Sequence, residues 1–218
     1  MDKFEEILND KEKMKILSKV IAHLMGDGCV TNRYLRYNNK NEFLLNDFKK
    51  DFKELFGEIH FITGKVNSGT SFIQVQNKEI LNFLRSLIPD FRSSALRFPK
   101  FFNEIDCKVA FLSAIFDDEG CAGLRIFQKT KEIKRNLEIA SKSQNFLGDI
   151  KNILEEDFNI KCNKIINFKR NLNQKEFITW KLSITGKENF VNFRDRINFN
   201  APIKRERLNL MISSYIRK

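Results

Sequence analysis

The chain repeats itself, and an internal repeat constrains the fold more than any single motif does. Residues 35–56, LRYNNKNEFLLNDFKKDFKELF, align without a gap on residues 137–158, LEIASKSQNFLGDIKNILEEDF. Upstream of these blocks, MGDGC at residues 25–29 matches DDEGC at residues 117–121. The matched blocks have the same order in both halves. The sequence therefore predicts two copies of one structural unit.

Each copy has the pattern of an apolar helix, two strands, an amphipathic helix, two strands and a last helix. The apolar helices are predicted at about residues 11–27 and 106–119, and each ends at a glycine suited to the left-handed position that follows a helix. In the amphipathic helices, large apolar residues recur four positions apart, which places them on one face. The last strands alternate apolar and polar residues, as expected where one sheet face covers a core and the other meets water. The inward positions are Ile73 and Val75 in the first copy and Ile178, Trp180, Leu182 and Ile184 in the second.

We therefore predict an α+β fold of two pseudo-symmetric αββαββα half-domains, each with an antiparallel sheet backed by helices. The half-domains are predicted at residues 1–92 and 105–218, joined by a basic, proline-containing linker at residues 93–104. The second copy has extra residues after its first glycine. They predict a long basic hairpin over residues 123–135, a shape that fits a DNA major groove.

The composition points to a polyanionic partner. Lysine and arginine number 39 against 28 acidic residues, for a net charge of +11, and nucleic acid is the leading candidate. No apolar run approaches the length of about 20 residues that a membrane span needs, and the first residues do not resemble a signal peptide. We expect an intracellular protein of the cytoplasm, nucleoid or organelle matrix that does not bind membranes. The four dispersed cysteines predict reduced, mostly buried thiols, not a zinc site.

Two acids are the most informative single residues. Asp27 and Glu119 each stand at the C-terminal end of an apolar helix, where the helix dipole disfavours an anion by about 0.3 to 1 kcal/mol. A helix that ends in Asp-Gly is common turn chemistry when it occurs once. An acidic residue in this unfavourable place at two equivalent positions of the repeat instead indicates that the two acids have a functional role.

Small residues four positions apart on the same helices would let the two backbones pack closely. If they do, the two acids emerge together, and their repulsion would be offset by divalent cations such as Mg²⁺, which hard oxygen ligands select. Such metals suit phosphodiester hydrolysis. The small residues are Ala22 and Gly26 on the first helix and Ala110 and Ala114 on the second.

The stretches VIAHLMGDG at residues 20–28 and LSAIFDDEG at residues 112–120 resemble the two LAGLIDADG motifs of the single-chain homing endonucleases. The resemblance implies a monomer whose sheets form a saddle, with the two motif helices at the central interface. It implies a site-specific, metal-dependent nuclease that makes a double-strand break across the minor groove of a long asymmetric DNA target and leaves short 3′ overhangs. Mg²⁺ or Mn²⁺ would support cleavage, and Ca²⁺ would bind without supporting it.

The resemblance also assigns site residues. Asp27 and Glu119 match the metal-binding acids, with Gly26 and Asp118 as further candidates beside the metal, although Asp118 is also expected to be structural or peripheral. His23 departs from the usual aliphatic residue of the motif, and a core histidine is favoured over a ligand at this position. The remaining catalytic candidates are Asn39, Lys40, Ser141, Lys142 and Lys204.

Outward-facing polar residues of the strands are the candidates to contact DNA. Arginine and lysine favour guanine edges, glutamine favours adenine, and glutamate can accept from cytosine. The alternative function is a LAGLIDADG protein that binds without cutting, either an intron RNA maturase or a DNA-binding regulator. The DNA-binding candidates are Arg33, Arg36, Gln74, Gln76, Arg125, Lys129, Glu138, Thr179, Lys181 and Ser183.

Overall fold

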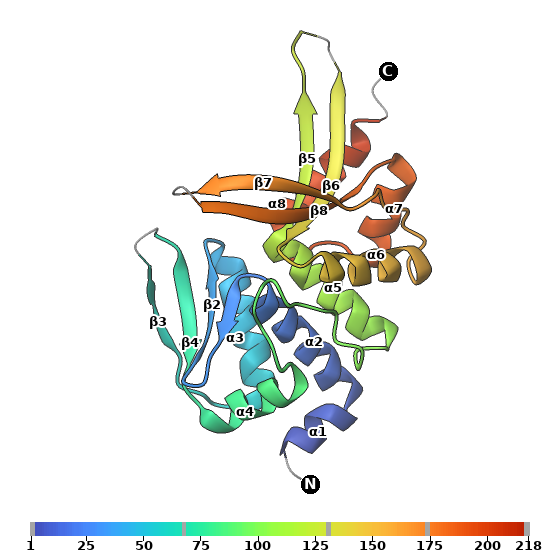
Figure 1. The fold of residues 1–218 in the computed structure, drawn as a ribbon. Coiled ribbons are helices and arrows are strands. Elements are labelled where there is room, and N and C mark those ends of the chain that lie inside the picture. The colour runs from blue at the N-terminus through green and yellow to red at the C-terminus, as the bar shows by residue number, and fades with distance from the viewer. Residues whose placement is uncertain (1–2, 67–68, 130–131, 173–174, 216–218) are drawn as a thin grey trace. The chain divides into compact units, whose positions relative to one another are not determined.

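The computed structural model describes residues 3–66, 69–129, 132–172 and 175–215. These residues form eight helices and two four-stranded antiparallel sheets (Figure 1), so the predicted α+β class is confirmed. The chain divides into two compact units, unit 1 (residues 1–118) and unit 2 (residues 119–218). Within the described ranges, no helix has the length and apolar character that a membrane crossing demands.

Unit 1 contains one sheet with the strand order β1-β2-β4-β3, and all its pairs are antiparallel. A short helix, α1, precedes the predicted αββαββ order. Its elements are α1 (Lys3–Asn9), α2 (Lys11–Met25), β1 (Gly28–Val30), β2 (Leu35–Asn39), α3 (Glu42–Phe56), β3 (Ile62–Lys65), β4 (Ser71–Val75), α4 (Lys78–Leu87) and α5 (Ile105–Glu119), whose last residue begins unit 2.

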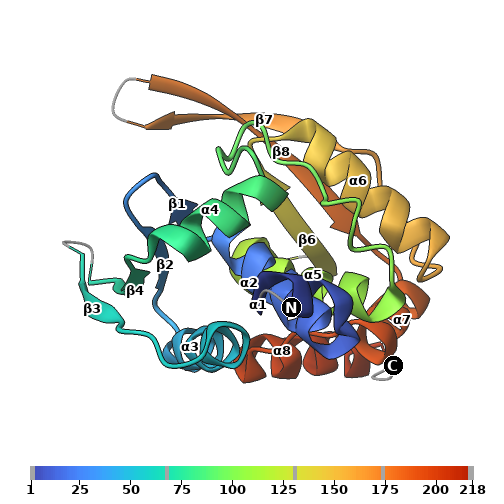
Figure 2. The ribbon, with the colours of Figure 1, turned by 90° about the horizontal axis from the view of Figure 1, so that it is seen from below.

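Unit 2 repeats this sheet with the strand order β5-β6-β8-β7, again antiparallel throughout. Helix α6 packs against β6 and β8 (Figure 2), and β5 and β6 form a ribbon that projects beyond the rest of the unit (Figure 1). Its elements are β5 (Gly120–Ile126), β6 (Ile133–Ser141), α6 (Gln144–Glu156), β7 (Ile166–Leu172), β8 (Lys175–Ile184), α7 (Lys187–Arg196) and α8 (Pro202–Ser213).

The repeat is visible in the hydrogen bonds that begin α3 and α6. In unit 1 the Asn39 Oδ1 atom accepts from the backbone N–H of Asn41 at 2.9 Å, and Asn41 is the N-cap of α3. At the offset of 102 residues, Ser141 Oγ accepts from the backbone N–H of Ser143 at 3.1 Å, and Ser143 caps α6. The N-cap side chains then accept from helix N–H groups that lack an intrahelical acceptor, Asn41 Oδ1 from Phe43 at 3.1 Å and Ser143 Oγ from Phe146 at 3.2 Å. The same strand-to-helix corner is therefore built twice.

The amphipathic helices bury the predicted stripes. Each stripe lies under its own sheet and contributes to that unit's core, so the periodicity prediction is confirmed. The buried stripe residues are Leu44, Phe48, Phe52 and Leu55 on α3, and Phe146, Ile150, Leu154 on α6 with Phe158 just after it.

Three sequence expectations about the fold need correction or restatement. Gly28 does not adopt the left-handed conformation, which among the described glycines occurs at residues 57, 69 and 186. A glycine is needed there for space, because a Cβ atom on Gly28 would lie 2.5 Å from the Leu24 Cα atom. On β8, Leu182 and Ile184 are buried as predicted, but Ile178 is 51% exposed because it lies beyond the end of the core.

The third expectation concerns the boundary between the two copies. The half-domains at residues 1–92 and 105–218, with a linker at 93–104, describe the duplication and stay a prediction. The compact units instead divide between residues 118 and 119. The physical reason is that α5 packs against α2 inside unit 1, so the first helix of the second copy belongs to the first unit.

Candidate functional site

Helices α2 and α5 lie in close contact within unit 1. The Ser18 hydroxyl donates to the Cys107 carbonyl oxygen at 3.0 Å. At their C-terminal ends, a Cβ atom on Gly26 would lie only 2.8 Å from the Asp118 Cβ atom. A glycine at this position is therefore needed for the helix ends to approach as closely as they do.

Asp118 is the centre of a buried polar network. Its side chain is fully buried, and its Oδ2 atom accepts from His23 Nδ1 at 2.8 Å. Its Oδ1 atom accepts from the Tyr37 hydroxyl at 2.7 Å and from the Asn39 Nδ2 atom at 3.2 Å. A buried carboxylate is tolerated when charge and donors compensate it. This geometry gives Asp118 a structural position, and its role beside a metal stays a prediction.

The network shifts the pKa values of His23 and Tyr37. Burial alone would lower the pKa of His23, but the charge of Asp118 and its hydrogen bond outweigh burial, and the net pKa is raised. Burial and the nearby Asp118 charge raise the pKa of Tyr37, so its hydroxyl keeps its proton and donates. His23 is fully buried, and its Nε2 atom has no hydrogen-bond partner among the described residues. It is a core histidine in this structure, at 5.0 Å between ring centroids from Tyr37.

Asp27 lies outside the core beside this network. Asp27 is exposed, and its Oδ2 atom accepts from Asn39 Nδ2 at 3.2 Å. The same Asn39 amide donates to Asp118, so one side chain connects the buried carboxylate with the exposed one. The Asp27 backbone carbonyl accepts from the backbone N–H of Asn38 at 3.1 Å, which holds the residue before β1 against β2.

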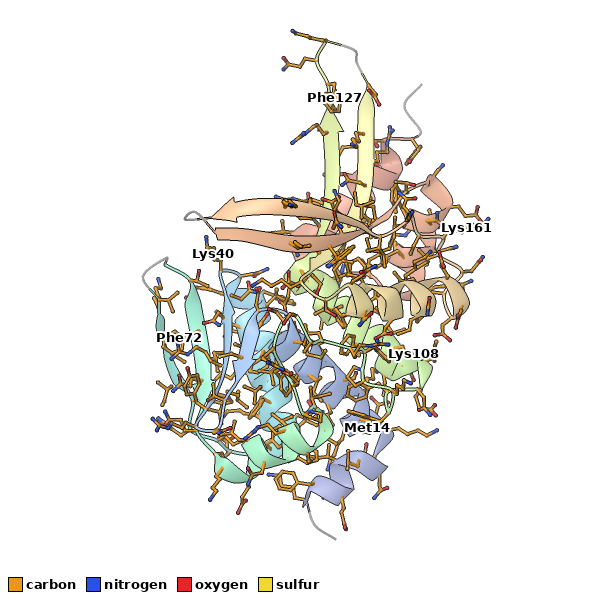
Figure 3. The ribbon with its side chains drawn as sticks, in the orientation of Figure 1. Met14, Lys40, Phe72, Lys108, Phe127 and Lys161 are labelled. Atoms are coloured by element: carbon orange, nitrogen blue, oxygen red, sulfur yellow. The ribbon has the colours of Figure 1, made fainter. Side chains whose placement is uncertain are left out.

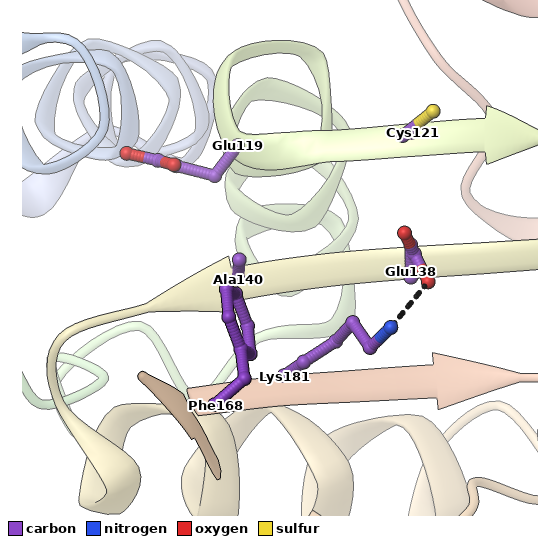
Figure 4. A pocket seen from close by; sticks show the side chains of 6 residues that line it. All are labelled: Glu119, Cys121, Glu138, Ala140, Phe168 and Lys181. Atoms are coloured by element: carbon purple, nitrogen blue, oxygen red, sulfur yellow. Dashed lines mark ion pairs between the residues drawn. The ribbon is translucent and has the colours of Figure 1, made fainter. Parts of the chain in front are cut away.

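Glu119 is exposed and is the last residue of α5. In unit 2 it lines a depression of about 330 Å³ together with residues of β5, β6, β7 and β8 (Figure 4). Lys204, from α8, donates its Nζ atom to the Gly120 carbonyl oxygen at 2.6 Å. The predicted lysine is therefore placed at the residue that directly follows Glu119. The depression is lined by Glu119, Cys121, Glu138, Ala140, Phe168 and Lys181.

The strand-end lysines, Lys40 and Lys142, are both exposed and occupy the same place in the two units, between a strand and the following helix. Lys40 is labelled in Figure 3. Among the described residues, no three His, Cys, Asp or Glu side chains cluster as a metal site. The assignments of Asp27, Glu119, Gly26, Asn39, Ser141, Lys40, Lys142 and Lys204 to catalysis or metal binding therefore stay predictions.

The open face of the unit 2 sheet carries polar side chains at alternate positions. Lys181 Nζ lies 3.2 Å from Glu138 Oε2, and Asn136 Nδ2 donates to the same oxygen at 2.8 Å. These groups line a hollow of about 580 Å³ with Arg125 and Ser183. Thr179 shares this face of β8, since it alternates with Trp180 and the buried Leu182. The projecting ribbon adds Lys129 next to β5, with Phe127 near its outer end (Figure 3).

The open face of the unit 1 sheet carries Arg36 on β2 and Gln74 on β4, which pair side by side. Arg33 lies exposed in the turn before β2, and Gln76 lies exposed just after β4. Placement on these faces is established for the strand residues, whereas contact with DNA stays a prediction.

Sequence reasoning missed two residues and one pairing, and it misjudged one thiol. Tyr37 and Asn136 were not singled out, although a tyrosine at an inward strand position needs a hydrogen-bond partner and so signals a buried polar group. The pairing of His23 with Asp118 was also missed, because 95 residues separate them. The prediction of mostly buried thiols is wrong for Cys121, which is exposed on β5, and only Cys107 is buried among the four.

Comparison with protein families supports the sequence resemblance. Residues 106–198 match the model of the LAGLIDADG-like domain. Two curated proteins of Methanocaldococcus jannaschii are also similar: glutamine–fructose-6-phosphate aminotransferase, 27% identical over 90% of this chain, and probable translation initiation factor IF-2, 27% identical over 87%. The chain spans 17% and 15% of the length of these relatives.

Solved structures share the fold. Full-length DUF199/WhiA from Thermatoga maritima matches with a TM-score of 0.61 and 17% identity over 98% of this chain and 66% of that chain. I-DmoI in complex with DNA and Ca matches with a TM-score of 0.58 and 14% identity over 90% of this chain and 97% of that chain. A related structure is described as the homing endonuclease I-DmoI. At these identities the similarity establishes the two-domain LAGLIDADG fold.

Proposed function

We propose that this chain, whose residues 106–198 match the LAGLIDADG-like domain and which shares the fold of I-DmoI, is a site-specific DNA endonuclease that makes a double-strand break in a long asymmetric target. The observation that carries the proposal is the pair of acids. Asp27 lies just after the C-cap of α2, and Glu119 is the last residue of α5. Both are exposed carboxylates near a helix C-terminus, where the helix dipole makes an anion unfavourable. A protein that only bound DNA would gain nothing from two acids at positions where the helix dipole destabilises an anion.

Each acid offers oxygen ligands that suit a hard divalent cation. Carboxylate oxygens at exposed positions are the ligands that Mg²⁺ and Mn²⁺ accept, with water completing their coordination. We propose Asp27 and Glu119 as the principal ligands, with the Gly26 carbonyl beside them. A bound cation of this kind supplies an activated water and stabilises the leaving oxygen in phosphodiester hydrolysis.

The neighbouring residues would orient the acids and neutralise the charge of a bound phosphate. Asn39 donates to Asp27 Oδ2 at 3.2 Å and so orients that carboxylate. Lys204, held on the Gly120 carbonyl, places a positive charge beside the start of β5, where it would stabilise a phosphate. Lys40 and Lys142 would contribute in the same way from the strand ends, with Ser141 as the counterpart of Asn39.

The charge and the sheet faces support a DNA substrate. A net charge of +11 favours a polyanion and predicts binding that weakens steeply with salt. The open faces of both sheets present arginine, lysine, glutamine and glutamate, which can hydrogen-bond to base edges in the major groove. Because the two faces carry different residues, the target would be asymmetric.

The curated relatives favour a homing role. An aminotransferase and a translation factor have unrelated activities, yet each contains a stretch similar to almost the whole of this chain within less than a fifth of its length. A mobile segment inserted in frame into unrelated genes would leave this pattern. A regulator with a fixed role has no reason to be distributed in this way.

The second candidate is a LAGLIDADG protein that binds nucleic acid without cutting it, either a DNA-binding regulator or an intron RNA maturase. The fold is compatible with this candidate, because the WhiA structure matches with a TM-score of 0.61, close to the 0.58 for I-DmoI.

One experiment separates the two candidates. A library of plasmids with randomised inserts is incubated with the protein and Mg²⁺, and the new DNA ends are sequenced. A nuclease yields a recurrent sequence at the ends, with short 3′ overhangs. Enrichment of one sequence by binding, without any recurrent cut in Mg²⁺ or Mn²⁺, would instead assign the chain to the binders.

A further inference from the structure

The guanidinium of Arg36 is fixed by a neighbouring strand. Arg36 on β2 stands directly opposite Gln74 on β4 in the antiparallel register. The Gln74 Oε1 atom accepts from Arg36 Nε at 3.0 Å and from Arg36 Nη2 at 2.6 Å. Two hydrogen bonds to one acceptor fix both the position and the plane of the guanidinium.

Aromatic rings complete the support of Arg36. Its guanidinium carbon lies 4.3 Å from the centroid of the Phe72 ring and 5.2 Å from that of Tyr34. Phe72 is itself held over β3, because the nearest atoms to a Cβ on Gly64 would be those of its ring, at 2.8 Å. Figure 3 labels Phe72 on the unit 1 sheet. Cation–π contacts of this kind favour a stacked guanidinium over a mobile one.

This arrangement leaves one edge of the guanidinium to face a ligand. Arginine has five N–H groups in a planar fork. Among the described residues, the hydrogen bonds of the Arg36 guanidinium to Gln74 use its Nε–H and one Nη2–H group. The end of the fork, formed by Nη1 and the second Nη2 N–H, remains as a pair of parallel donors.

Gln74 cannot act as an independent reader of bases. It is only 6% exposed, and its amide oxygen is engaged by Arg36. Its outward position on the strand predicted an adenine contact, but the Arg36 side chain covers it. Gln74 is therefore a positioning residue for Arg36.

Two parallel donors match guanine and no other base. Guanine presents N7 and O6 as adjacent acceptors in the major groove, whereas adenine presents one acceptor beside a donor and thymine a single oxygen. Resting on the proposed DNA-binding function, we propose that Arg36, held by Gln74 and Phe72, reads one guanine in the half of the target that unit 1 contacts. The target of this protein thus contains an obligatory G·C pair at that position.

The test starts from the site that the protein selects for itself. The full chain is used to select duplexes from a randomised DNA library with Ca²⁺, which we expect to support binding without cleavage. Competition binding then measures affinity for the selected duplex with each of the four base pairs at every position. We expect wild type to prefer guanine at one position by about 5- to 150-fold, the range for a good bidentate pair.

Four variants separate the possible roles of Arg36. Arg36→Lys keeps the charge but loses the planar fork and its hydrogen bonds to Gln74, so the preference at that single position should fall several-fold while the other positions are unchanged. Gln74→Leu should weaken the same preference, because it removes the acceptor that orients the fork, whereas Gln74→Glu keeps an acceptor and should retain it. Arg85→Lys, the same substitution on the exposed face of α4, serves as the matched control and should leave the profile at wild type. Thermal melting of each variant establishes that it is folded.

Three other outcomes would contradict the proposal that Arg36 reads a guanine. If Arg36→Lys lowers affinity equally for all four base pairs, Arg36 contacts phosphate. If the variant keeps the wild-type profile, the pair with Gln74 only stabilises the sheet. If wild type itself enriches no sequence, the proposed function fails together with the inference.

Discussion

The Nδ1 atom of His23 lies 2.8 Å from the Oδ2 atom of Asp118, and both side chains are fully buried. Each residue departs from the motif on its own helix, since LAGLIDADG has leucine at the fourth position and alanine at the seventh. The two departures compensate each other, because an imidazole faces a carboxylate. Tyr37 and Asn39 supply the remaining donors, so the pair forms part of a hydrogen-bonded network and not an isolated buried charge.

The first prediction tests this compensation by a double-mutant cycle. His23→Leu leaves the Asp118 carboxylate buried without its partner, and removal of one partner of a buried pair costs about 3 to 5 kcal/mol. The double variant His23→Leu/Asp118→Ala restores the residues of the motif at both positions and should recover much of that stability. Urea unfolding of the four proteins measures the coupling. Additive losses in the double variant would contradict the pairing.

The second prediction concerns pH. The pKa of His23 is raised in the folded protein from its usual 6.5, so the protonated form is favoured by folding. Its contribution to stability is fully present below that value and is lost as the pH rises through the folded-state pKa. The unfolding free energy of wild type should therefore fall relative to that of His23→Gln as the pH rises above 6.5. Parallel curves for the two proteins would show that His23 does not titrate in this way.

The third prediction concerns the contact between α2 and α5. Gly26→Ala places a methyl group where Asp118 Cβ lies 2.8 Å away, so the helix ends must separate, at a cost of about 1 to 3 kcal/mol. Gly148→Ala is the matched control, because this glycine lies inside α6 and its Cβ would meet nothing within 4 Å. That substitution should stabilise by about 0.5 to 1 kcal/mol. Thermal melting distinguishes the two signs, and a harmless Gly26→Ala would contradict the close contact.

Much of the fold could be predicted from the sequence because the relevant signals are local. The i, i+4 stripe of α3 and the alternation around Ile73 depend on residues within one element, and both predictions are confirmed. Alternation identifies a face but not the extent of the core, and for this reason Ile178 was misplaced. Likewise, Gly28 was expected to end a helix, but α2 ends at Met25 with Gly26 as its C-cap, and Gly28 begins β1. The glycine at residue 28 is required because its backbone lies close to Leu24, which spacing alone does not reveal.

The candidate site was less predictable, since its contacts join distant segments. The motif placed Asp118 beside the expected metal, whereas its three partners come from α2 and β2 and are at least 79 residues away. No local sequence pattern predicts that Tyr37 and His23 both contact Asp118. The sequence predicted that Arg36 and Gln74 each contact a base independently. The cross-strand register places them opposite each other, so that Gln74 orients Arg36.

The fourth prediction concerns Asn39, whose amide joins Asp27 and Asp118. Asn39→Ala should reduce cleavage by about 10- to 100-fold, the usual cost of losing a group that orients a metal ligand. DNA binding should be retained, because the sheet faces are unchanged. The control is Asn82→Ala on the exposed face of α4. Equal loss of binding and cleavage in Asn39→Ala would assign Asn39 to DNA contact instead of to Asp27.

The central claim is that one acid in each half of the duplicated chain is required for cutting but not for recognition. The most direct measurement follows Mg²⁺-dependent cleavage and Ca²⁺-supported binding of the selected target by wild type, Asp27→Asn and Glu119→Gln. We predict that both variants bind as wild type does and that double-strand cleavage falls by orders of magnitude in each. A variant that binds and still cuts both strands at the wild-type rate would contradict the account.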